Sequence, residues 1–160
     1  MSKWRVIQGC PANRLIAPYI ALLAKETGAT INSLYRGNDA RAILHRHGKH
    51  SQSELYEMYL QGHGNPANPP GRSTHELRSD SAAYAGPTGR KLEWWQQGID
   101  VNDDDVKKMI VAAERHGWEL FQPYRSGSEF HHINFRRRPK PRNRRERLKI
   151  IMLRARLPRK

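Results

Sequence analysis

The positive charge of this chain is concentrated at its C-terminal end, and this limits which part can form a folded body. Residues 136–160 contain 13 Lys and Arg residues and one acid, Glu146, whereas residues 1–135 carry 16 basic and 14 acidic groups. A nearly neutral segment of that length is typical of one domain. We therefore expect one domain over residues 1–135 and a basic C-terminal arm over residues 136–160.

The composition excludes several classes of protein. Only 37% of the 160 residues are apolar, but 13 aromatic residues, four of them Trp, are enough for a modest core. The single cysteine, Cys10, excludes an internal disulfide and a cysteine-based zinc ribbon, so a metal site must use histidines and carboxylates. The longest apolar stretch, residues 15–24, is interrupted by Pro18 and is too short to span a bilayer. No apolar segment follows the first residues, so we expect no cleaved signal peptide.

Apolar periodicity and capping residues predict helices and short strands that do not alternate as βαβ units. The pattern is that of an α+β protein with a small antiparallel sheet and flanking helices. Helices are expected over residues 13–27, 39–47 and 51–60, between Asn102 as N-cap and Gly117 as stop, and strands over 29–35, 98–101, 118–122 and 130–136.

Two of the eight histidines, His75 and His132, have carboxylates nearby in segments that look ordered. Strand alternation puts Asp100 on the opposite face from Ile99 and Val101, and a carboxylate beside a core strand is costly unless it is paired or bound to a cation. Two histidines and an aspartate from separate segments are typical of a catalytic zinc site whose fourth position is open for water. Five other histidines are expected in solvated loops or helix ends: His45, His47, His50, His63 and His116.

Glu129 precedes His132 by three residues, at the start of the last expected strand. From the turn before that strand its carboxylate can reach the neighbourhood of a bound metal and accept a proton from water. A pair such as His131-His132 is also typical of a surface pair between strands, so this segment alone leaves both interpretations open.

Five short motifs, considered together, resemble a known family. They are Tyr35-Arg36, Gln52 before Leu55-Tyr56, Ser73-x-His75, Gly98-Ile99-Asp100-Val101 and Glu129-x-x-His132. Their order resembles the zinc D-alanyl-D-alanine carboxypeptidase and L-alanyl-D-glutamate endopeptidase family, which cleaves peptidoglycan and is related in fold to the hedgehog signalling domain. The segment Asn-Pro-Pro-Gly-Arg-Ser-Thr-His-Glu and the Trp-Trp-Gln before Gly-Ile-Asp resemble bacteriophage endolysins. The resemblance covers about residues 30–135.

The resemblance implies a role for each matching residue. His75, Asp100 and His132 would bind zinc. Glu129 would be the general base, and Arg36 would stabilise the oxyanion. Three further residues would contact the substrate: Gln52, Ser73 and His131.

The chain departs from the family pattern in two places. His131 stands where the family usually has Trp. The gap from His75 to Asp100 is 25 residues, longer than the family's, so residues 76–97 are interpreted as an insertion that forms a substrate-facing loop. Asp80 is the rival ligand; Asp100 is preferred because its apolar neighbours favour a strand, whereas the neighbours of Asp80 favour a loop.

The basic arm contains a helical pattern over residues 143–157. Its apolar residues could form one face of a basic amphipathic helix that binds anionic wall polymers or an anionic membrane surface. The alternative is a helix that packs on the body through Ile150 and Leu153. The apolar residues at helical spacing among the arginines and lysines are Leu148, Ile151, Met152 and Ala155.

These features predict a monomeric, zinc-dependent peptidoglycan peptidase that serves phage lysis or entry. It would be made in the host cytoplasm and act at the cell wall, or be carried in the virion. Two alternatives remain: a polyanion- or nucleic-acid-binding protein with structural histidines and aspartate, and an inactive metal-bearing domain that binds cell wall. Nucleic acid is not expected as a partner, because the charge lies outside the body and Trp94-Trp95 is the one aromatic platform in view. The bond that is cleaved stays open.

Overall fold

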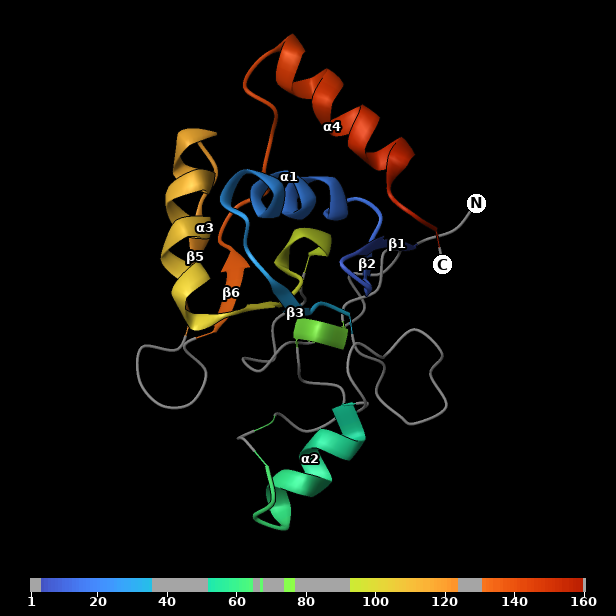
Figure 1. Ribbon diagram of the computed structural model, residues 1–160, viewed down its shortest axis with the longest axis vertical. Helices are drawn as coiled ribbons and strands as arrows, with labels where there is room; N and C mark the ends of the chain where they lie inside the picture. The colour runs from blue at the N-terminus through green and yellow to red at the C-terminus, as the bar shows by residue number, and fades with distance from the viewer. Residues whose placement is uncertain are drawn as a thin grey trace.

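The computed structural model describes residues 4–35, 52–64, 67, 74–76, 93–123 and 131–159. Over these residues it contains four α-helices and two small antiparallel sheets (Figure 1), which confirms the α+β class. None of these helices is both long and apolar enough to cross a membrane. The helices are α1 (Ala17–Thr27), α2 (Gln52–Leu60), α3 (Asp103–Arg115) and α4 (Arg144–Arg156), with 3-10 turns η1 (Thr74–Glu76) and η2 (Trp94–Gln96). The strands are β1 (Trp4–Ile7), β2 (Cys10–Asn13), β3 (Ile31–Ser33), β4 (Ile99–Val101), β5 (Leu120–Phe121) and β6 (His132–Phe135).

Strands β1 and β2 form a hairpin that the sequence pattern did not predict. Gln8 and Gly9 make its turn with φ angles of 49° and 83°, and positive φ at both central residues suits the twist of a two-residue hairpin. Glycine favours this conformation and glutamine does not. Only the second of the two turn residues therefore matches the pattern that predicts such a hairpin. Because β2 includes Asn13, the first helix begins at Ala17, with Pro18 in its first turn, and not at residue 13.

The second sheet has four antiparallel strands in the order β3-β4-β6-β5. In this sheet Asp100 lies opposite Ser33 on one neighbouring strand and opposite His132 on the other. Side chains directly opposite one another share a face, so these three form a polar row across the sheet. Ile99 and Ile133 alternate with them and are fully buried on the other face. The prediction that Asp100 faces away from its apolar neighbours is confirmed.

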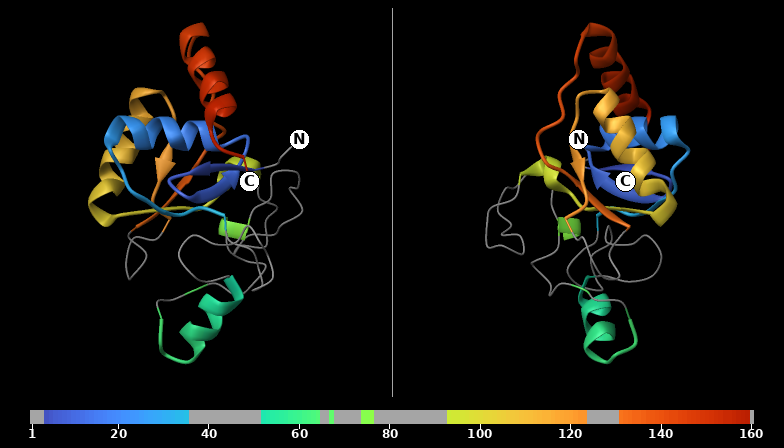
Figure 2. Two further views of the ribbon diagram at one scale, coloured as in Figure 1. Left: turned by 45° about the vertical axis from the view of Figure 1, so that its right-hand side comes forward. Right: turned by 90° about the vertical axis from the view of Figure 1, so that its left-hand side faces the viewer.

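Helices α1 and α3 cover the apolar face of this sheet, on the side away from η1 (Figures 1 and 2). They bring Leu23 and Met109 into one core with Ile99 and Ile133. Helix α1 ends as predicted at Gly28, which adopts a left-handed conformation with φ of 69°. The helix expected over residues 39–47 lies outside the described residues.

The first turn of α3 is tied to β3. Asn102 is the N-cap residue as predicted, but its side chain does not cap the helix: its Oδ1 accepts a hydrogen bond of 2.9 Å from Asn32 Nδ2. Asp105 instead accepts from the backbone N–H of Thr30 at 3.0 Å and from Lys108 Nζ at 2.9 Å. These two bonds lower the pKa of Asp105, and the one from Thr30 has the larger effect.

Helix α4 lies within the expected range of residues 143–157 and packs on α1. Ile150 is only 3% exposed, and Leu153 packs against the core. Beyond the helix, the backbone N–H of Val6 in β1 donates to the carbonyl oxygen of Pro158 at 2.8 Å. Two arrangements were considered for this segment: a free amphipathic helix, and a helix that packs on the body through Ile150 and Leu153. The structure shows the packed helix. The division of the chain into a peptidase domain and an arm stays a prediction.

A histidine and two carboxylates fasten α4 to α1 and α3 in one charged cluster. His116, at the C-terminal end of α3, contacts Glu146 of α4 through Nδ1 and Glu26 of α1 through Nε2, the latter at 2.8 Å. Its ring stacks on Trp118 with 4.4 Å between the ring centroids. The backbone N–H of Arg142 also donates to Glu146. The predicted helix-end position of His116 is confirmed, but its two carboxylate partners come from distant segments.

Replacing Glu146 by glutamine is expected to destabilise the fold at neutral pH by about 1–3 kcal/mol, because the new NH₂ group would face a donor. Burial by itself raises the pKa of Glu146, but hydrogen bonds from the backbone of Arg142 and from His116 outweigh it and lower the pKa from 4.5. Such a carboxylate stabilises the fold above its ordinary pKa, and this contribution is lost as the pH falls through the lower, folded-state value.

Urea unfolding across a pH series checks this expectation. The difference in unfolding free energy between wild type and Glu146→Gln should be largest at neutral pH and should shrink below about pH 4.5. Glu114→Gln, at an exposed position of α3, is the matched control and should leave stability unchanged. A difference of the same size at acid and neutral pH would show that the charge of Glu146 is not what stabilises the cluster.

Candidate metal centre

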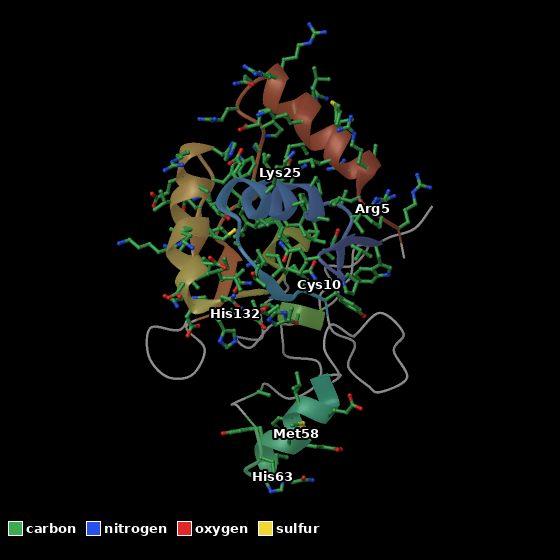
Figure 3. The ribbon with its side chains drawn as sticks, in the orientation of Figure 1. Arg5, Cys10, Lys25, Met58, His63 and His132 are labelled. Atoms are coloured by element: carbon green, nitrogen blue, oxygen red, sulfur yellow. The ribbon has the colours of Figure 1, made fainter. Side chains whose placement is uncertain are left out.

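Three side chains from separate parts of the chain meet on the polar face of the four-stranded sheet. His75 lies on η1, Asp100 on β4 and His132 on β6, and the three are 2%, 6% and 5% exposed. Asp100 Oδ1 is 2.8 Å from His132 Nδ1 and 3.1 Å from His75 Nε2, and the two nitrogens are 3.0 Å apart. Figure 3 shows His132 beside η1, at the edge of the core.

The backbone determines which ring nitrogen of His75 carries the proton. His75 Nδ1 is 2.5 Å from the carbonyl oxygen of Leu34. A carbonyl oxygen can only accept, so Nδ1 is the donor. In the neutral ring Nε2 is then left with its lone pair, and this is the nitrogen that faces Asp100.

A side-chain amide does the same for His132. Its Nε2 is 2.8 Å from Asn134 Oδ1. Asn134 Nδ2 donates at 2.9 Å to the carbonyl oxygen of Gln96, and this bond fixes which end of the amide is the acceptor. Nε2 of His132 is therefore the donor, and the lone pair of Nδ1 faces Asp100.

The three atoms that face one another are thus acceptors when both imidazoles are neutral. Metal-binding histidines characteristically donate their other ring N–H to a carbonyl or carboxylate, as both do here. A tetrahedral ion with nitrogen and oxygen ligands at about 2.0–2.2 Å separates them by roughly 3.3–3.5 Å, close to the observed 2.8–3.1 Å. The group His75, Asp100 and His132 could therefore hold a metal ion.

Asp100 has the charge that a metal ligand needs. Burial by itself raises the pKa of its carboxyl group, but the attraction of a protonated His75, and the hydrogen bonds that His132 and His75 donate when a proton lies on the nitrogen facing Asp100, outweigh burial and hold the pKa well below its usual value. When both imidazoles are neutral, a bound cation would take the place of those protons. Metal-binding carboxylates must be deprotonated, so this side chain is ready for the role at neutral pH.

Cys10 is not a competing ligand or nucleophile. Its side chain is buried, and burial together with the charge of Asp100 raises the pKa of the thiol to about 12. The thiolate is the reactive and metal-binding form of cysteine, so the protonated Cys10 serves as a small core residue.

Gly98 is required by the close approach of η1 to β4. A Cβ atom at this position would lie 2.6 Å from Thr74 Oγ1, 2.7 Å from His132 Cε1 and 2.8 Å from His75 Nε2. The backbone N–H of Gly98 also donates to the carbonyl oxygen of Thr74 at 3.2 Å. The absence of a side chain therefore lets both imidazoles reach Asp100.

Replacing Gly98 by alanine is expected to weaken metal binding at least tenfold, although every ligand is retained. The added methyl group must displace one or both rings, and loss of a ligand's positioning partner alone typically costs about 10–100-fold in affinity. Competition with a chromophoric chelator measures the change. Gly64→Ala is the matched control, because its nearest neighbour is Met58 Cβ at 3.3 Å, in α2. Equal affinities for the Gly98 and Gly64 variants would contradict the expectation.

The other predicted site residues fall into two groups. His131 directly precedes β6; its side chain is 31% exposed, and its Nε2 lies 4.0 Å from Asp100 Oδ1, at the rim of the group. Gln52 is the first residue of α2. The following lie outside the described residues, so their roles stay predictions: the side chain of Gln52, and Arg36, Ser73, Asp80 and Glu129.

Several residues of the centre were not selected from the sequence. Asn134 shares a strand face with His132 by simple alternation, and that spacing could have identified it. The carbonyl of Leu34 has no sequence signature, because every residue carries one. Ser33 extends the polar row beside Asp100, and its buried Oγ has no hydrogen-bond partner within the described part of the chain.

Comparisons with protein-family models, curated proteins and solved structures found no match to this chain.

Proposed function

We propose that this chain is a zinc-dependent peptidase that hydrolyses amide bonds in the stem peptides or cross-bridges of bacterial peptidoglycan. The observation that carries the proposal is the convergence of His75, Asp100 and His132, with both imidazoles held in the metal-binding tautomer. The order of motifs around these residues supports the proposal, since it resembles the D-alanyl-D-alanine carboxypeptidase and L-alanyl-D-glutamate endopeptidase family with its hedgehog-like fold. The segment around His75 and the Trp-Trp-Gln before Gly98 resemble bacteriophage endolysins, so the wall of a phage host is the proposed site of action.

The donor set favours zinc over other metals. Two imidazole nitrogens and one carboxylate oxygen are a ligand set that catalytic zinc sites use, with a fourth position left for water or substrate. Calcium and magnesium prefer sites built from oxygen ligands alone. Bound zinc would act as a Lewis acid and lower the pKa of water from about 16 to about 7.

The remaining roles fall to residues of the matching motifs. Glu129, as general base, would accept a proton from the attacking water and deliver it to the leaving amine. Arg36 would stabilise negative charge on the carbonyl oxygen of the scissile amide. His131 is partly exposed at the rim of the centre, where it could contact the peptide together with Gln52 and Ser73.

Digestion of purified peptidoglycan tests the proposal directly. The purified protein should release new amino termini from sacculi, a strong chelator should stop the reaction, and zinc should restore it. Mass spectrometry of the fragments would show whether the cleaved bond is L-Ala–D-Glu or a D-Ala cross-bridge. New reducing sugar ends without new amines, or full activity after the metal is removed, would refute the proposed function.

A further inference from the structure

Helix α4 carries apolar side chains on two opposite faces. The inner face packs on the body through Ile150 and Leu153. On the outer face Leu148, Ile151 and Met152 are 50%, 50% and 48% exposed. Their spacing of three and four residues places them in one stripe along the helix. They make up half of the large exposed apolar side chains found among the described residues. A contiguous exposed apolar patch is typical of an interaction surface.

Basic side chains border this stripe on both sides. Glu146 is the one acid of α4, and it is buried in the cluster with His116 and Arg142. The exposed outer surface of the helix is therefore purely cationic around its apolar centre. The exposed basic residues of the helix are Arg144, Arg145, Arg147, Lys149 and Arg156.

The outer face of α4 is open and lies apart from the candidate metal centre. Figures 1 and 2 show α4 at one end of the molecule, with α1 between it and the sheet that carries His132. In Figure 3 the side chains on the outer side of α4 point away from α1 and the body. A ligand of this face would approach without touching the polar face of the sheet.

We propose that the outer face of α4 binds an anionic phospholipid bilayer, with the helix lying in the plane of the surface. Leu148, Ile151 and Met152 would enter the boundary between headgroups and acyl chains, while the flanking arginines and lysine contact the anionic headgroups. Nucleic acid or an anionic wall polymer would satisfy the charges but offers no apolar phase for these three side chains. This surface is independent of metal binding and so goes beyond the proposed peptidase function.

Flotation with lipid vesicles tests this surface. The full chain should float with phosphatidylcholine vesicles that contain phosphatidylglycerol and should not float with pure phosphatidylcholine. The triple variant Leu148→Ser, Ile151→Ser, Met152→Ser should partition at least about tenfold more weakly, since buried apolar side chains of this size contribute strongly to transfer out of water. The matched control is a triple serine variant of the exposed apolar residues elsewhere, Tyr59, Leu60 and Val111. It should bind like wild type.

A variant with fewer charges separates the electrostatic contribution to vesicle binding from the apolar one. Arg145→Gln, Lys149→Gln and Arg156→Gln together should lower binding to the anionic vesicles by roughly fivefold for each residue. All three side chains are exposed, so the thermal unfolding midpoint should stay unchanged. High salt should weaken wild-type binding in the same direction, because it screens exposed charges.

Four results would overturn the proposal. The first is unchanged vesicle binding by the Leu148, Ile151 and Met152 variant, and the second is wild-type binding to pure phosphatidylcholine as strong as to anionic vesicles. The third is binding to DNA or teichoic acid without binding to anionic vesicles. The fourth is a dimer in sedimentation that the triple variant converts to a monomer. His132→Ala should still float with anionic vesicles. Failure of the peptidase proposal therefore leaves this test intact, and the reverse also holds.

Discussion

Replacing His132 by alanine is expected to abolish zinc binding and, with it, hydrolysis of peptidoglycan. Its Nδ1 lies 2.8 Å from Asp100 Oδ1 and 3.0 Å from His75 Nε2, at the point where the three donor atoms meet. Removing the imidazole takes away one of three protein ligands. The loss should therefore exceed the roughly 10–100-fold that is typical when only a hydrogen-bond partner of a ligand is removed. The wild-type chain should retain one zinc ion after dialysis against a weak chelator, and elemental analysis measures the difference.

Two neighbouring substitutions serve as controls. His131→Ala changes the adjacent residue at the rim and should keep the metal. Asn134→Ala removes the acceptor for His132 Nε2 and should weaken binding by only about 10–100-fold. Retention of zinc by His132→Ala at the wild-type level would refute the metal centre. The same measurement on Asp100→Ala and Asp80→Ala decides which aspartate is the ligand.

Replacing Glu129 by glutamine is expected to lower peptidoglycan hydrolysis by about 10²–10⁴-fold, the usual contribution of a general base. Glutamine keeps the size of the side chain but cannot accept the proton from water. Glu129 is not among the three proposed ligands, so zinc content and thermal stability should both stay at the wild-type level. Initial rates on purified sacculi measure the loss.

The matched control for this variant is Glu114→Gln, which removes an exposed carboxylate from α3. It should leave the rate unchanged. A Glu129→Gln enzyme that works within threefold of wild type would exclude Glu129 as the base. A variant that loses zinc together with activity would point instead to Glu129 as a ligand.

Local sequence patterns predicted most of the helices because caps and periodicity act within a few residues. Gly28 ends α1 as expected, and the helix expected over residues 51–60 is present as α2 over its described residues, Gln52–Leu60. The β1–β2 hairpin was missed because Gln8 adopts a positive φ only through the pairing of the strands around it. Residue preference alone would not place a glutamine there.

For the candidate metal centre too, the sequence predicted one part and the tertiary structure decided the other. Residue chemistry selected His75, Asp100 and His132, since few other residues combine metal-binding groups with apolar, strand-like surroundings. Their convergence depends on β4 pairing with β6 and on η1 approaching over Gly98. Such contacts join segments 25 and 32 residues apart, and no local pattern encodes them.

For α4, the sequence by itself determined the helix and the residues that share each of its faces, because helical periodicity is a property of the local chain. Which face is buried was decided only by the tertiary structure. Ile150 and Leu153 meet α1, Glu146 meets His116, and the stripe of Leu148, Ile151 and Met152 is left exposed. Both faces are apolar enough to pack, so the choice between them depends on the shape and charge of the surface that the rest of the fold presents.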